Sequence, residues 1–436
     1  MQVAWKYAQL GLLVLPLWPL IGVLMLLLGC GQTWRRQYRS ILRRPLNWGL
    51  AIFSVWLVIT AGFAYDKSYA FVGLFNFLPY FLVFTGYSSL IQTPFQLRRW
   101  AEILVVTSVP VVIIGLGQMF WSWASDSQFV EFLWGGAIKP TGSPPGRMAS
   151  IFMYANTLAG YLVVVFSLGL GLWIENLQTL NAKRPVPRAT WLRLGFLSVA
   201  VVGNLVALIL TDSRNAWAIA VFIGLAFAVY QGWRWLVAGV AIAASSILGA
   251  AFGPPLVRQW LRTIIPTFFW ARLTDQLYQR PLTTLRQTQW EFAWSLSQQH
   301  PWLGWGLRNF TPLYQAHTQV WLGHPHNFLL MLTAETGIPF AIFFCAWVSC
   351  IVIEGFQILR DWTGIAASAL GQQLSERLIF FSYLVAFLAC VLCNLVDVTV
   401  FDVRLNSLGW LLLSAICGVV YHRRATKGIM GLKPHR

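Results

Sequence analysis

The apolar positions of this chain form long uninterrupted runs rather than an alternating pattern. A helix needs about 20 apolar residues to cross a hydrocarbon layer about 30 Å thick. Runs near this length recur along the whole chain and exclude a membrane β-barrel, whose strands alternate. We predict about eleven (10–12) transmembrane helices, over residues 9–29, 47–64, 70–91, 100–121, 150–173, 194–211, 215–230, 234–253, 336–356, 378–396 and 405–422.

The composition supports the same class of protein. Apolar residues make up 57% of the 436 residues and charged residues 10%, whereas soluble domains carry about 25% charged residues. These values exclude a soluble enzyme, a disordered chain and a disulfide-stapled secreted domain. The six cysteines lie in or beside apolar runs, where we expect small packed side chains without disulfides or metal. We predict an all-α polytopic membrane protein, a single integral membrane domain over residues 1–436.

The positive charges are unevenly distributed between the connections. The formal net charge is +17, but this balance does not require a nucleic-acid partner, because Arg-rich cytoplasmic loops produce it in membrane proteins. Of the 31 Lys and Arg residues, 19 fall on one side of the predicted topology, the side that includes the C-terminus. The positive-inside rule makes that side cytoplasmic. Residues 254–325 then form one large periplasmic loop.

The large loop has features of an ordered segment. It contains six arginines against Asp275 and Glu291, and it is neither low in complexity nor rich in Gly and Ser. Residues 282–299 are typical of an amphipathic helix, with Arg286, Trp290 and Trp294 on one stripe. A helix of this kind suits the membrane interface; a solvated loop with an aromatic anchor is the alternative.

Polar residues gather in four clusters at the outer ends of the predicted helices. The clusters are Arg147 with Asn156; Asp212-Ser213-Arg214; Arg286 with Trp290, followed by the sequence HPWLGWG at 300–306; and His324 with His326-Asn327, followed by Glu335 and Gly337. Taken singly, such residues cap helices, anchor the chain to lipid phosphates or lie in loops. Three arginines and a histidine on one face of a chain so poor in charge indicate instead a site for a polyanion, with a base.

These side chains suit transfer chemistry without a metal. Arginine binds phosphate oxygens bidentately and stabilises a departing pyrophosphate, while neutral histidine can accept a proton from a hydroxyl. No metal-ligand motif occurs on the outer face, and we expect no cofactor. Glu335 follows His326 by nine residues, which on one continuous helix places it on the opposite face.

The clusters, in this order, resemble the O-antigen ligase and O-antigen polymerase superfamily over roughly residues 70–420. The most specific match is His326-Asn327 followed after nine residues by Gly337. The resemblance implies a GT-C-like fold in the bacterial inner membrane. It implies an inverting, metal-independent transfer of a glycan from undecaprenyl pyrophosphate to an acceptor hydroxyl at the periplasmic face. The residues that it implies are catalytic His326, Arg214 and Arg286, and substrate-binding Arg147, Asn156, His324, Asn327 and Trp290.

The sequence leaves the acceptor open. Ile338-Pro339-Phe340 follows Gly337 without the second glycine and the threonines of lipid A-core ligases, so both lipid A core and another lipid-linked glycan remain as acceptors. The expected partners are therefore the carrier-linked donor, one of these acceptors and membrane lipids. A different class, a small-anion transporter for an ion such as bicarbonate, is the alternative function. It would place its polar site near the bilayer midplane, whereas here charge gathers at one face. A non-enzymatic lipid-binding scaffold is a third reading.

Overall fold

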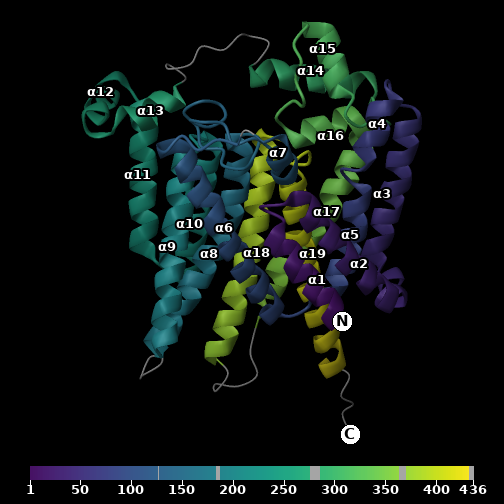
Figure 1. Cartoon of the computed structure of the whole chain (residues 1–436), viewed down its shortest axis with the longest axis horizontal. Helices are drawn as coiled ribbons and strands as arrows, with labels where there is room; N and C mark the ends of the chain where they lie inside the picture. The colour runs from purple at the N-terminus through teal and green to yellow at the C-terminus, as the bar shows by residue number, and fades with distance from the viewer. Residues whose placement is uncertain (126, 183–186, 275–284, 363–369, 432–436) are drawn as a thin grey trace.

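The computed structural model describes residues 1–125, 127–182, 187–274, 285–362 and 370–431. These residues form helices and connecting loops, with no strand among them. Long helices run side by side as a bundle, and short helices α12 to α16 cover one end of it, which we call the loop end (Figure 1). The C-terminus lies at the opposite end.

Ten candidate membrane spans occur among the described residues, judged by length and composition. They confirm the prediction of an all-α polytopic membrane protein, and each overlaps a predicted apolar run. They are α3 (Pro45–Gly62), α4 and α5 together (Lys67–Leu74 and Leu78–Leu90), α6 (Pro94–Phe120), α8 (Ala155–Ala182), α9 (Arg188–Leu210), α10 (Arg214–Gln231), α11 (Arg234–Phe252), α17 (Ile338–Arg360), α18 (Leu370–Val396) and α19 (Val403–Gly431).

The prediction of one spanning helix over residues 9–29 is wrong. The chain instead forms a hairpin of α1 (Gln2–Val14) and α2 (Pro19–Leu42). Proline cannot donate the backbone hydrogen bond of a helix interior and is tolerated in the first turn, so Pro19 begins a new helix. The hairpin is tight because glycines face the partner helix: a Cβ on Gly22 would lie 2.4 Å from Leu15 Cα, and one on Gly11 would lie 2.8 Å from Leu26 Cγ.

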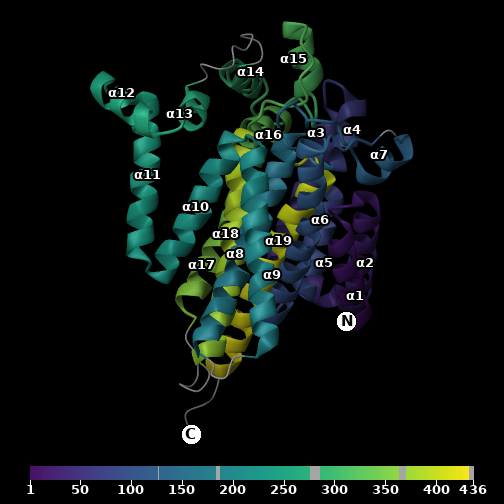
Figure 2. The same cartoon turned by 60° about the vertical axis from the view of Figure 1, so that its left-hand side comes forward.

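The centre of the bundle is formed by α8, α18 and α19. In the most apolar stretch of each helix, the buried share of the residues is 83% for α8, 61% for α18 and 89% for α19. By contrast, only 11% of the corresponding stretch of α11 is buried, and α11 stands at the edge of the molecule with α12 (Pro255–Ile264) and α13 (Thr267–Leu273) at its end (Figure 2). All six cysteines are free thiols, as predicted, although Cys350 is exposed.

The loop end includes the stretch 254–325, of which residues 275–284 lie outside the described residues. The predicted helix at 282–299 is present as α14 (Arg286–Gln299). Its buried residues are Gln289, Ala293, Leu296 and Ser297, whereas Trp294 of the predicted stripe is 45% exposed. The buried face packs on α16 (Phe328–Thr336), to which Ser297 Oγ donates a hydrogen bond at Thr333 Oγ1, 2.9 Å away.

The PWLGWG segment fastens α14 to the junction between α16 and α17. Backbone N–H groups of Trp305 and Gly306 donate to the carbonyls of Ala334 and Glu335, each at 2.9 Å. These carbonyls lie in the last turn of α16, where helical partners are missing. Gly337 has φ +87°, and a Cβ there would lie 2.1 Å from Trp302 O. The glycines and tryptophans of this segment therefore build the scaffold for the neighbouring histidines. Two further short helices complete the loop end, α7 (Gln128–Trp134) and α15 (Phe310–Thr318).

Candidate functional site

Arg147 lies on a loop that is pinned to α6 and α9. The side chain of Gln118 is fully buried and accepts hydrogen bonds from Ala149 N and Ser150 N, at 3.0 and 2.8 Å. Met148 N donates to Leu210 O at 2.9 Å, which ties the loop to the last turn of α9. Backbone bonds on both sides thus fix the position from which the Arg147 side chain projects.

The guanidinium of Arg147 joins the first two predicted clusters. Its Nε donates to Thr211 O at 2.8 Å, and one terminal nitrogen donates to Asn156 Oδ1 at 2.6 Å. Thr211 ends α9, and Arg214 is the first residue of α10 three positions later. Arg147 and Asn156 are therefore bonded to each other, and Arg214 lies three residues along the chain from the carbonyl that Arg147 binds.

Asp397 connects this pair of clusters to the histidines. Asn156 Nδ2 donates to Asp397 Oδ2 at 3.1 Å, and Asp397 Oδ1 lies 3.9 Å from His324 Nε2. Sequence reasoning missed Asp397, because a single carboxylate just after an apolar run is typical of a helix end. Its signal was the rarity of acid in this chain, which has only 14 Asp and Glu residues.

The two histidines hold each other in defined tautomers. The backbone N–H of His326 donates to His324 Nδ1 at 3.2 Å. The ring nitrogen Nδ1 of His326 lies 3.2 Å from the carbonyl oxygen of His324. A carbonyl can only accept, so His326 Nδ1 carries the proton and the lone pair of the neutral ring is on Nε2. By the same reasoning His324 carries its proton on Nε2, the nitrogen that faces Asp397.

The surroundings of His324 keep it neutral. Burial lowers the pKa of His324 to about 4, and the neighbouring charges of His326 and Arg286 act in the same direction. Asp397 acts in the opposite direction but does not prevail. Arg286, the first residue of α14, is thus near enough for its charge to act on His324.

The remaining residues singled out in the sequence, Asn327, Trp290 and Glu335, lie at a helix cap or are buried. Asn327 caps α16, since its Oδ1 accepts from Leu330 N at 3.1 Å. The indole nitrogen of Trp290 is buried without a hydrogen-bond partner among the described residues. Glu335 is 2% exposed and accepts from Phe310 N at 3.4 Å, and no described contact joins its carboxylate to His326.

The structure places three potential metal ligands together, which the sequence motifs did not indicate. One ligand atom from each of His324, His326 and Asp397 lies within 4.8 Å of the others. Tetrahedral zinc, with bonds of about 2.0–2.1 Å, needs ligand atoms about 3.4 Å apart and nitrogens with lone pairs. The tautomer of His324 instead directs an N–H toward Asp397. The donor set therefore fits a polar relay better than a metal site.

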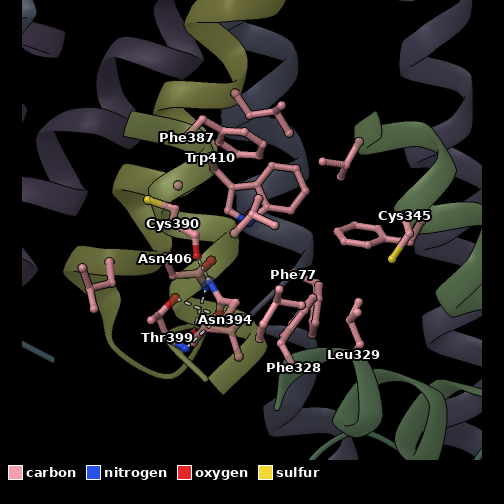
Figure 3. Close-up of a pocket in the computed structure, with 18 of the residues that line it drawn as sticks. Phe77, Phe328, Leu329, Cys345, Phe387, Cys390, Asn394, Thr399, Asn406 and Trp410 are labelled. Carbon is pink, nitrogen blue, oxygen red and sulfur yellow. Dashed lines mark hydrogen bonds between the residues drawn. The ribbon is translucent and has the colours of Figure 1, made fainter. Parts of the chain in front are cut away.

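An apolar pocket of about 300 Å³ lies between α16 and α17 on one side and α18 and α19 on the other, and Phe328, two residues after His326, lines it (Figure 3). Phe77, Phe328, Phe387 and Trp410 contribute aromatic walls. The amide oxygen of Asn394, which also lines it, accepts hydrogen bonds from the N–H and hydroxyl groups of a single threonine, at 3.0 and 3.1 Å. The pocket therefore suits a hydrocarbon chain.

Comparison with known proteins gave one family. The family model described as O-antigen ligase matches residues 199–345, which include Arg214, Arg286 and His326. A search of the curated proteins found no match. The family match confirms the resemblance that the sequence motifs indicated.

Proposed function

Residues 199–345 of this chain belong to the O-antigen ligase family, and we propose that the chain transfers a glycan from undecaprenyl pyrophosphate to an acceptor hydroxyl. The reaction takes place at the loop end, which we assign to the periplasmic face of the bacterial inner membrane with the C-terminus in the cytoplasm. The observation that carries the proposal is the tautomer of His326: its Nδ1 donates to His324 O, so Nε2 is the basic nitrogen. The family match gives no support to the small-anion transporter alternative.

In the proposed step the acceptor oxygen attacks C1 of the donor sugar from the face opposite the pyrophosphate. The new C1–O bond forms as the C1–O bond to the pyrophosphate breaks, and configuration at C1 is inverted. The bonding electrons leave with the pyrophosphate oxygen, and the acceptor proton passes to His326 Nε2. Arg214 and Arg286 stabilise the charge that develops on the leaving group, since guanidinium groups bind phosphate oxygens strongly.

The neighbouring residues prepare this step. The carboxylate of Asp397 and the amide of Asn156 link Arg147 to the histidine pair, so the donor-binding arginine and the base keep a fixed spacing. The apolar pocket beside Phe328 accepts a hydrocarbon chain of a membrane-embedded substrate. Such a chain is already out of water in the bilayer, so the pocket selects it by shape and packing rather than by transfer from water.

The test uses purified protein with an undecaprenyl-pyrophosphate-linked oligosaccharide in the presence of EDTA, with and without lipid A core. Gel analysis and mass spectrometry resolve glycan on lipid A core, the ligase product, from longer lipid-linked glycan, the polymerase product. NMR of the new linkage gives the configuration at C1. We expect turnover in EDTA, and its loss would contradict a metal-independent reaction.

Variants assign the roles. Arg214→Ala, Arg286→Ala and His326→Ala should each abolish transfer while the protein remains folded. Arg43→Ala is the matched control, because Arg43 is exposed and lies at the far end of α3 from the site. Full activity of His326→Ala would exclude this histidine as the base.

A further inference from the structure

Arg308 is a further arginine at the loop end, and its backbone is tightly held. It has φ +61°, a left-handed conformation that is unfavourable for a non-glycine residue. The next residue, Asn309, is buried and binds the turn before α4: its Oδ1 accepts from Asp66 N at 2.7 Å and its Nδ2 donates to Asp66 O at 3.1 Å. Gly73 packs against the side chain, since a Cβ there would lie 3.2 Å from Arg308 Cγ. Strained positions held in this way concentrate at functional sites.

The guanidinium of Arg308 lies over an aromatic ring that stacks on His324. Its central carbon lies 5.1 Å from the centroid of the Phe401 ring. The Phe401 ring in turn lies 5.8 Å from the His324 ring, with 22° between their planes. Arg147 is connected to the Nε2 atom of His324 by way of Asn156 and Asp397. Arg308 is connected to the face of the same ring by way of Phe401. The site therefore has arginines on two approaches to the histidines.

Arg308 has a charge that the described protein groups do not neutralise. It is half-buried, and no described carboxylate lies within the 4.0 Å of an ion pair. The carboxyl of Glu335 interacts with the backbone N–H groups of Arg308 and Phe310 and with the charge of Arg308, but burial raises its pKa to about 8, so it is mostly neutral at pH 7. A guanidinium in this position presents its donors to a compact oxyanion.

Residues that line the apolar pocket adjoin in sequence the residues that contact Arg308. Thr399 and Val400 line the pocket and directly precede Phe401, the ring under Arg308. Phe77 also lines it, four residues after the glycine that packs against the arginine. An anionic group and a hydrocarbon chain on one molecule could therefore occupy Arg308 and the pocket together.

We infer that Arg308 binds the acceptor through a phosphate or carboxylate group, and that the acceptor is an anionic lipid whose hydrocarbon chain enters the pocket. This assignment of donor and acceptor rests on the proposed function, in which Arg214 and Arg286 hold the donor pyrophosphate. The site thus binds two anionic groups at separate positions. The donor pyrophosphate leaves with the carrier lipid, and the anionic group of the acceptor positions the attacking hydroxyl beside His326.

The first test measures binding without turnover. The probes are lipid A core and the undecaprenyl-pyrophosphate-linked oligosaccharide, each bound separately to the full chain in detergent. Dephosphorylated lipid A core and lipid A core with its carboxylates converted to amides distinguish the two sources of negative charge. We expect Arg308→Gln to weaken binding of an anionic probe by about 10- to 100-fold, the usual worth of a hydrogen bond to a charged group.

Two more variants separate charge from backbone conformation. Arg308→Gly removes the guanidinium but relieves the positive φ, so it should bind as weakly as Arg308→Gln while remaining folded. Arg308→Lys keeps the charge and should recover part of the affinity. Equal binding of both probes by the wild type and Arg308→Gln would overturn the inference, as would the absence of binding to the wild type.

The second test measures transfer. Arg308→Gln should raise the acceptor KM by about 10- to 100-fold and leave the donor KM unchanged; a rise in the donor KM alone would overturn the acceptor assignment. If the wild type binds the anionic probe through Arg308 but transfers nothing, the proposed function fails while the anion site stands.

Discussion

At the scale of single residues, His324 is placed to orient His326, the base of the proposed reaction, rather than to exchange protons. Its pKa of about 4 keeps the ring neutral above that pH. Its Nδ1 and its carbonyl oxygen both bond to His326, which has φ +52°. Asp397 faces its other nitrogen. The ring of His324 therefore holds the backbone turn from which the His326 side chain projects.

Replacing His324 tests this positioning role. We expect His324→Ala to lower kcat about 10- to 100-fold, because small displacements of a catalytic group have effects of that size. His324→Asn should recover much of the loss, since an Asn side chain can accept the bond from the N–H two residues later. Steady-state transfer kinetics measure both variants, and full activity of His324→Ala would contradict the role.

Glu335 is a second residue whose environment decides its state. Burial raises the pKa of its carboxyl to about 8, against an ordinary value of 4.5. The folded state then binds the proton more tightly than the unfolded state. The stability that this proton contributes is fully present below pH 4.5 and is lost as the pH rises through 8. The loss reaches roughly 3–5 kcal/mol at alkaline pH.

Glu335→Gln should therefore unfold at the same temperature as the wild type near pH 5 and at a higher temperature near pH 8.5. Glutamine has the shape of the neutral acid and does not ionise. Tryptophan fluorescence during heating measures the unfolding temperature of both proteins at each pH. The effect of other titrating groups is the same in both and cancels in the difference between them. A variant that is less stable than the wild type at every pH would show that the carboxylate form is required.

At the scale of elements, the segment from Pro301 to Gly306 and the junction of α16 and α17 form one unit. Ile338 N donates to Pro301 O at 2.8 Å, and Tyr65 N donates to Trp305 O at 3.0 Å. The unit thus joins α3, α14, α16 and α17. Since α16 follows His326 and Asn327 directly, its fixed position is a condition for the placement of the base.

Gly337→Ala tests this unit. The positive φ alone costs about 1–2 kcal/mol with a Cβ, and the contact with Trp302 O at 2.1 Å adds to it. We expect a lower unfolding temperature together with reduced transfer. Gly195→Ala is the matched control, because Gly195 has no atom within 4 Å of an added Cβ. Equal stability of the two variants would show that the junction tolerates a side chain.

At the scale of the whole molecule, the pocket lies between four helices that are far apart in the sequence, and Gly409 offers a way to fill it. Gly409 lines the pocket, and an added Cβ meets no atom within 4 Å. Gly409→Leu should therefore fold normally and raise the KM of the lipid whose chain enters the pocket. Separate variation of donor and acceptor concentrations identifies that lipid. Unchanged KM for both would exclude the pocket as a substrate site.

Much of this molecule follows from its sequence. The apolar runs predicted every one of the ten candidate spans, with ends that differ by at most about seven residues, because the thickness of a bilayer sets their length. The order of the Arg, Trp and His clusters indicated the family. The N-terminal hairpin was missed because Pro16 and Pro19 interrupt a run that is apolar on both sides, and hydropathy does not register a turn.

Only the tertiary structure decided how the candidate residues meet. Asp397 and Arg308 are distant in sequence from the histidines, so the positions of α18, α19 and the loop before α15 had to be known before either could be associated with them. The tautomers of His324 and His326 depend on hydrogen bonds within a turn, which no sequence pattern specifies. The sequence determined which chemical groups are present and that they gather at one membrane face; the fold decided which of them are neighbours, because contacts between helix ends depend on how the helices pack.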